Sequence, residues 1–487
     1  MAGIGFELKK LFEKRGLFAS IRAYGVGIAV CAGPMLLNVA LLSGIRYISE
    51  RTGMQSQEQE FLICMLSYTF IASLLITSVL SMVTARYTAD MLYQEQYQFV
   101  LPSLFGSQTI SLTAGIALYG GFLLLSGIEP VYILLCTVLF SELIVVWSQI
   151  QYITAIKDYK SILAAFFTSI VIALGSGFLI GLAGVKPLIA FMSGVIIGYG
   201  VMLVWNFYLL HLYFPAGEGS AFQFLLWIKR YPKLFFIGLF TTLGLFGHII
   251  IMWFSPAGVS IRGLLYAAPS YDIPALFAFL STLITTVNFI TSLEVNFYPY
   301  YRNYFDLMNT RGMLTDMRRA EDEMLTVLKQ ELFYLALQQG FATILLIVIG
   351  GPVFLGWNMG FNETFLGTFN TLCIGYALYA IGNSIMLVQL YFTDDTGAFY
   401  SSLLFMLSAN IGTLFFLFQD YRFYGFGFLI GGFVMYVCTW IRLALYARKL
   451  VFHILCSQPV NPQNNQNKRW RTLQLISTNC QLLEDGK

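Results

Sequence analysis

The sequence predicts an all-α polytopic membrane protein, with about twelve transmembrane helices arranged in two lobes of six. Three observations support this prediction. Hydrophobic residues account for 57% of the 487 residues and charged residues for only 11%, whereas about a quarter of an ordinary soluble domain is charged. The apolar residues form twelve runs, and about 20 such residues are enough to cross roughly 30 Å of hydrocarbon. The gaps between the runs are alternately basic and nearly uncharged.

The distribution of Lys and Arg predicts the orientation. With twelve spans, 23 of the 28 Lys and Arg residues lie on one side of the membrane and five on the other. Loops that stay in the cytoplasm retain these residues, so we expect a cell-membrane protein with its basic side and both termini in the cytoplasm. One gap on this side contains Asp394 and Asp395 and no basic residue. The five residues on the other side are Arg46, Arg51, Lys186, Arg262 and Arg422.

Residues 1–21 are predicted to form an amphipathic helix on the cytoplasmic membrane surface, because charged and apolar residues are mixed between Phe6 and Phe18. The first lobe is expected in residues 22–211 and a polar cytoplasmic linker in residues 212–233. The predicted spans are 22–45, 61–84, 103–126, 131–154, 161–183, 187–211, 234–255, 273–294, 332–350, 366–391, 399–418 and 426–447.

The second lobe is expected in residues 234–454 and includes a long cytoplasmic connection, residues 295–331. The connection begins with a segment dense in Tyr and Arg and continues as a charged helix, residues 316–329, in which Met317, Met324, Leu325 and Leu328 are apolar. That helix would lie on the membrane surface, dock a partner, or simply join two spans in solvent. The candidate docking residues are Arg302, Arg311, Arg318 and Arg319. The tail, residues 455–487, is rich in Gln and Asn and is predicted to be disordered.

Polar side chains inside the spans are the candidate path residues, because ionisable groups in hydrocarbon usually face a cavity or a partner. Glu142 lies in the middle of the fourth span among apolar neighbours. It would accept hydrogen bonds from substrate hydroxyls, couple transport to protons, or form a structural hydrogen bond to a neighbouring helix. The other amide candidates, each of which would also serve to hold helices together, are Asn38, Asn206, Asn288, Asn383 and Gln389. Glu294 is a candidate at the inner end of the eighth span, beside tyrosines that would anchor the helix at the interface or stack on sugars.

Pro34 interrupts the first span and is a candidate hinge, although a simple packing bend would explain it equally well. His211 and His248 have no partner at metal-ligand spacing, and the seven cysteines form no CxxC pair. No P-loop or catalytic triad is visible. We therefore expect no metal, no cofactor and no enzymatic activity, and transport would draw on an ion gradient or on the growth of the product.

The first eight residues, MAGIGFEL, resemble the start of the PelG family, and Gly33-Pro34 in the first span, the twelve spans and the chain length agree with it. That resemblance implies a fold of the MOP flippase superfamily, which includes the MATE exporters. It implies export of an N-acetylgalactosamine-rich polysaccharide made by a cytoplasmic family-4 glycosyltransferase, PelF. It also implies a PelD-like receptor for cyclic di-GMP and a PelE-like membrane protein as partners, and no nucleic acid.

Four functions remain open. The first is a transporter that accepts the nascent polysaccharide from a docked glycosyltransferase. The second is a flippase for lipid-linked oligosaccharides, and the third is a membrane anchor that activates the glycosyltransferase without transporting. The fourth is a cation-coupled exporter of small molecules.

Overall fold

The computed structural model describes residues 40–45, 47–48, 54–156, 159–217, 219–309, 313–356 and 363–450. The predicted helix 1–21, the tail 455–487, and Pro34, Asn38 and Arg311 lie outside the described residues. Within the described part, eleven helices are long and apolar enough to cross a membrane. They correspond to the second to twelfth predicted spans, so this part of the prediction is confirmed.

In the described part of the first lobe, the helical residues 40–45 and 47–48 precede the long helix α3, and each later span starts close to its predicted residue. Pro187 at the start of α8 suits the first turn of a helix, where its missing N–H leaves no hydrogen bond unmade. The elements are α3 (Ser56–Tyr93), η1 (Tyr97–Phe99), α4 (Val100–Gly115), the π-helical turn η2 (Ile116–Gly120), α5 (Gly121–Leu125), α6 (Pro130–Ile156), α7 (Tyr159–Leu182) and α8 (Pro187–Tyr213).

The second lobe contains the described part's two strands as well as helices. The predicted span 273–294 is broken into two helices, and Pro274 lies inside the first. The elements are α9 (Leu225–Arg230), α10 (Pro232–Trp253), β1 (Val259–Arg262), β2 (Leu265–Ala267), α11 (Pro269–Leu280), α12 (Thr282–Thr291), the π-helical η3 (Ser292–Phe297), α13 (Tyr298–Asn309), α14 (Leu314–Gly356), α15 (Glu363–Tyr391), α16 (Asp395–Phe416), η4 (Tyr421–Phe423) and α17 (Phe426–Ala447).

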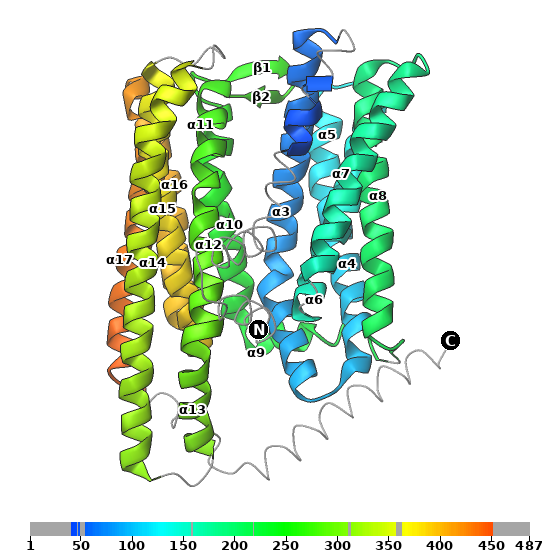
Figure 1. The fold of residues 1–487 in the computed structure, drawn as a ribbon. Coiled ribbons are helices and arrows are strands. Elements are labelled where there is room, and N and C mark those ends of the chain that lie inside the picture. Colours follow the sequence, from blue (N-terminus) through cyan, green and yellow to red (C-terminus); the bar gives the residue numbers. More distant parts are fainter. Residues whose placement is uncertain are drawn as a thin grey trace, which may run out of the picture.

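The spanning helices form two groups, with α3–α8 in one and α10–α17 in the other (Figure 1). The groups meet where α3 packs against α10. At this contact Gly238 of α10 approaches the backbone of Ser78 so closely that a Cβ at 238 would lie 2.3 Å from the Ser78 carbonyl oxygen. The two-lobe architecture is therefore as predicted, whereas the exact domain bounds, 22–211 and 234–454, stay predictions.

Close packing inside the first lobe depends on glycine. A Cβ on Gly194 of α8 would lie 2.6 Å from Gly177 and from the Ala173 carbonyl oxygen of α7. One turn further, a Cβ on Gly198 would lie 2.5 Å from the Ser169 carbonyl oxygen. Small residues let helix backbones approach, which is how van der Waals contact holds helices together in a bilayer.

The described residues of the connection 295–331 are mostly helical. Helix α14 contains 43 residues in one piece, so it is about 65 Å long at 1.5 Å per residue. That is about twice the hydrocarbon thickness, and α13 with the start of α14 projects beyond the other helices in Figure 1. We call residues 298–331 the stalk, this end of the bundle the stalk end, and the opposite end, with β1 and β2, the hairpin end.

The stalk has its own apolar core. Met324 is fully buried and Leu328 is 3% exposed, and both belong to a cluster with Tyr304 of α13 and Phe297 of η3. The apolar side of the charged helix is thus covered within the chain. The apolar side of this helix packs on α13, and its contact with the membrane surface or with a docked partner stays a prediction.

Candidate functional site

Glu142 lies inside the first lobe, where α6 packs against α8. Its Oε2 atom is buried and accepts no hydrogen bond from any residue that the structure describes. Its Oε1 atom lies 3.5 Å from the point where a Cβ on Gly200 of α8 would sit, so the carboxyl reaches α8 because residue 200 has no side chain. A carboxyl without hydrogen-bond donors is costly in a membrane interior. The structural interpretation, a hydrogen bond to a neighbouring helix, has no partner among these residues.

Two further amides lie between the same helices. Gln149, two turns after Glu142, donates from Nε2 to the Leu203 carbonyl at 3.3 Å, while its Oε1 has no partner in the described chain. Asn206 follows three residues after Leu203, is completely buried, and makes no side-chain hydrogen bond there. We call Glu142, Gln149 and Asn206 the α6–α8 seam.

Gln149 was not among the residues singled out from the sequence. It lies seven residues after Glu142, a spacing that returns to the same face of a helix. This seven-residue spacing is the sequence feature that could have identified Gln149. Asn206 was singled out, but only the packing of α8 on α6 relates it to the other two.

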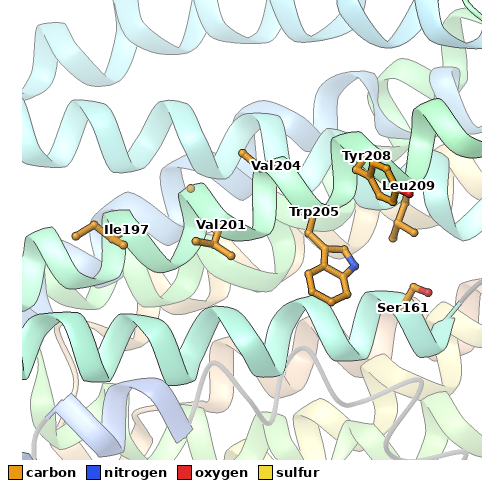
Figure 2. Close-up of a pocket in the computed structure, with 8 residues that line it drawn as sticks. Ser161, Ile197, Val201, Val204, Trp205, Tyr208 and Leu209 are labelled. Atoms are coloured by element: carbon orange, nitrogen blue, oxygen red, sulfur yellow. The ribbon is translucent and has the colours of Figure 1, made fainter.

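An apolar groove of about 730 Å³ runs along α8 next to this seam. Figure 2 shows Trp205 projecting from α8 across the groove toward α7, on which Ser161 lies. Gly200 lines the groove and also borders the Glu142 carboxyl. The lining is otherwise mostly aliphatic and aromatic, so it suits a hydrocarbon chain better than a hydroxyl-rich sugar.

The remaining predicted path residues lie in the second lobe and are not brought to the seam. Gln389 is fully buried and donates to the Thr439 carbonyl at 2.9 Å, which is a helix-to-helix bond. Asn288 of α12 is 9% exposed, and Asn383 of α15 is half-buried. Glu294 lies in the π-helical segment η3, and its side chain lies outside the described atoms.

A polar cluster in the second lobe was missed by the sequence analysis. His248 of α10 is fully buried between two tyrosines, with Nδ1 2.7 Å from the Tyr271 hydroxyl and Nε2 3.3 Å from the Tyr376 hydroxyl. Next to it, the Asp272 carboxylate accepts from Trp253 Nε1 at 3.1 Å and from the Ala268 N–H at 3.0 Å. These groups satisfy one another, so the cluster is a packing element rather than an open site.

The acidic gap that departed from the charge pattern has a partner from a distant span. Asp394 is 3% exposed, caps α16 by accepting from the Gly397 N–H at 3.0 Å, and pairs with Arg442 of α17. Arg442 donates to both carboxylate oxygens, at 2.6 and 2.8 Å. The missing basic neighbour is therefore supplied by the tertiary structure.

The stalk is not a basic surface. Residues 298–331 contain five Lys and Arg but six Asp and Glu. Arg302 pairs with Asp306 at 3.5 Å and Arg319 with Glu323 at 3.1 Å, while Arg318 is exposed. Among the tyrosines, Tyr304 is buried, and burial raises the pKa of its hydroxyl to about 12. Docking through Arg302, Arg318 and Arg319 stays a prediction, but its surface is of mixed charge.

The two helical lobes have the fold of MOP-type membrane transporters, as the comparisons with solved structures show. The eukaryotic MATE transporter AtDTX14 matches with TM-score 0.56 and 14% identity, over 88% of this chain and 98% of that chain. A MOP superfamily transporter from Pyrococcus furiosus matches with TM-score 0.55 and 10% identity, over 87% and 96%. An inward-facing MATE structure gives TM-score 0.58 and 10% identity, over 86% and 95%.

The chain belongs to the PelG family, whose model is described as a putative exopolysaccharide exporter and matches residues 1–455. No curated protein matches the chain. The resemblance of the first residues and of the fold is thereby confirmed.

Proposed function

We propose that this protein moves a growing, N-acetylgalactosamine-rich exopolysaccharide across the cell membrane, from a family-4 glycosyltransferase at the stalk end to the outside at the hairpin end. The observation that carries this proposal is the match of an exopolysaccharide-exporter family over residues 1–455 of a chain with a two-lobe transporter fold. Both termini and the stalk would lie in the cytoplasm, in agreement with the Lys and Arg distribution.

The charge content of the spans supports a neutral substrate. Mid-span ionisable groups are few, and the second-lobe carboxylates Asp272 and Asp394 already have hydrogen-bond partners. A path with few unpaired charges suits a neutral sugar polymer better than a strongly ionic solute. Glu142 is then the candidate group for proton coupling or for contact with sugar hydroxyls.

Reconstitution with the glycosyltransferase and its sugar nucleotide tests the proposal. Liposomes with the synthase outside and this protein in the membrane should accumulate labelled polymer in the lumen, protected from an added glycosidase. Liposomes without this protein should make polymer that stays fully accessible. Polymer made at a normal rate but never protected would instead support an anchor that only activates the synthase, assisted by PelD-like and PelE-like partners.

A second candidate is a flippase for lipid-linked oligosaccharides, and the groove along α8 favours it. Its apolar lining and volume of about 730 Å³ fit part of a lipid tail. The same liposomes supplied with a fluorescent lipid-linked oligosaccharide, without synthase, distinguish the two. Rapid protection of the lipid-linked substrate supports the flippase, and protection only of nascent polymer supports the exporter.

A further inference from the structure

The hairpin formed by β1 and β2 connects two helices of the second lobe but makes polar contacts with the first lobe. We propose that this hairpin is a latch that holds the hairpin ends of the two lobes together, and that its release opens the transport path on that side. This inference rests on the proposed function, since it assigns a gate to a path between the lobes.

The central contact is made by one hydroxyl. Tyr68 of α3 donates to the Tyr266 carbonyl at 3.1 Å and accepts from the Tyr266 N–H at 3.1 Å. The Tyr68 ring is held in place by stacking on Trp253, with ring centroids 4.2 Å apart. A single side chain of the first lobe thus binds both backbone groups of a residue in strand β2.

The turn of the hairpin docks on the loop between α5 and α6. The Leu264 N–H donates to the Ser126 carbonyl at 2.9 Å. Gly263 has φ of +57°, and a Cβ there would lie 2.0 Å from the same Ser126 oxygen. The contact therefore needs glycine twice, once for the left-handed backbone and once for the close approach.

The third contact is an ion pair with aromatic support. Arg262 of β1 lies 3.2 Å from Glu129, and its guanidinium lies 5.1 Å from the Phe61 ring centroid and 5.8 Å from that of Tyr132. Arg262 is about half exposed, so water can replace these interactions when the lobes separate.

The nature of these contacts suits a reversible latch. They are hydrogen bonds and one exposed ion pair, each of modest net strength, whereas the lobes also meet nearer the stalk end where Gly238 packs on Ser78. Separation at the hairpin end can break the latch while that packed contact serves as the pivot. Loss of the few interactions in the latch is then enough to shift the population from the latched to the open state.

Reversible cross-linking across the latch tests its role in export. Arg262→Cys with Glu129→Cys, joined by a bis-methanethiosulfonate reagent, should lose export and recover it when a reductant removes the linker. The matched control, Val259→Cys with Ala267→Cys, joins two paired residues within the hairpin and should keep export when cross-linked. Full export by the cross-linked 262–129 protein would overturn the latch.

Spin-label distances test the latch without any polymer. Labels at Leu182→Cys and Phe418→Cys lie on exposed residues of the two lobes at the hairpin end. Tyr68→Phe keeps the ring but loses both hydrogen bonds, and with Gly263→Ala it should add a population with a longer distance in nanodiscs. The control is Gly184→Ala. Gly184 has a left-handed backbone like Gly263 (φ +87°), but a Cβ there would meet open space, so this change should leave the distance unchanged.

The two experiments separate the inference from the proposed function. If the uncross-linked protein exports no polymer but Tyr68→Phe lengthens the distance, the latch stands and the proposed function fails. If export occurs and neither Tyr68→Phe nor Gly263→Ala changes the distance, the latch is wrong while the exporter stands.

Discussion

Glu142 combines a cost to stability with a position that suits function. Its Oε2 is buried without a hydrogen-bond donor among the described residues, and such a group lowers stability compared with an apolar side chain of similar shape. Proteins retain groups of this kind mainly where activity requires them. If Glu142 has a functional role, removing its carboxyl should therefore raise stability, whereas a structural role predicts a loss of stability.

We expect Glu142→Met to raise the free energy of unfolding by about 1–2 kcal/mol, because it removes an unsatisfied buried acceptor. Export should fall strongly in the same variant and in Glu142→Gln. Thermal unfolding in detergent and secreted polymer at matched protein level measure the two effects. The control is Gln339→Met, which loses the buried hydrogen bonds with Thr285 and Thr343 and should lower stability. A lower unfolding temperature for Glu142→Met would instead indicate a structural role.

Asp394 and Arg442 show how a buried acid depends on one distant base. We expect Arg442→Ala to lower the free energy of unfolding by about 1–3 kcal/mol, since it leaves a 3%-exposed carboxylate without its bidentate partner. The double variant Asp394→Asn with Arg442→Ala should lose less than the sum of the two single changes. Additive losses in this thermal-unfolding cycle would show that the pair is not coupled.

At the scale of elements, the pair α7 and α8 depends on glycine at particular positions only. We expect Gly194→Ala to lower the free energy of unfolding by about 1–3 kcal/mol, because its Cβ would overlap the α7 backbone. Gly175→Ala in the same helix pair, where a Cβ meets nothing within 4 Å, should stabilise by about 0.5–1 kcal/mol. Equal effects of the two changes on thermal unfolding would contradict this account of the packing.

The apolar residues of the stalk show that a sequence pattern can predict a helix without identifying the surface on which it packs. The charged helix within residues 316–329 was predicted, and its apolar residues were visible in the sequence. Their partner was not, because an apolar stripe is the same whether it faces lipid, a partner or another helix. The structure supplies α13 as the partner, and Met324 and Leu328 are buried against it.

At the scale of the whole molecule, the first lobe also contacts the segment between the lobes, residues 219–233, at the stalk end. Trp227 Nε1 donates to Asp90 at 2.8 Å, and Arg86 of α3 lies 5.4 Å from the Tyr231 ring centroid. Together with the latch, these contacts join the lobes at both ends in this structure. Movement of the lobes in the bilayer therefore has to break one set while the other holds.

We expect Trp227→Phe to add a longer-distance population at the stalk end, because a hydrogen bond to a carboxylate is worth about 1.5–3 kcal/mol and each 1.4 kcal/mol is about tenfold in an equilibrium. Spin labels at Tyr93→Cys and Lys449→Cys, both exposed, report this distance. The pair at Leu182 and Phe418 should not change. A change at both ends would mean that the lobes do not move about a pivot.

Much of the fold follows from the sequence, and less of the site. The spans from α3 to α17 were placed correctly along the chain, because the length of an apolar run and the charges at its ends respond directly to the bilayer. Two helices extend beyond their predicted bounds, since α3 ends at Tyr93 and α14 starts at Leu314. Glu142 was found because a mid-span carboxylate is conspicuous. Gln149 was missed because an amide in a span is common helix glue, and only packing against α8 shows that its Oε1 lacks a partner.

The sequence by itself determined the class of protein, the number and order of the described spans and the sign of the charge at each end, since each depends on local composition. The tertiary structure decided which polar groups satisfy one another. It pairs Asp394 with Arg442 and His248 with Tyr271 and Tyr376, and it leaves Glu142 without a donor. It also places the 259–267 hairpin on the opposite lobe. Such contacts join residues far apart in the chain, and no local pattern encodes the distance between them.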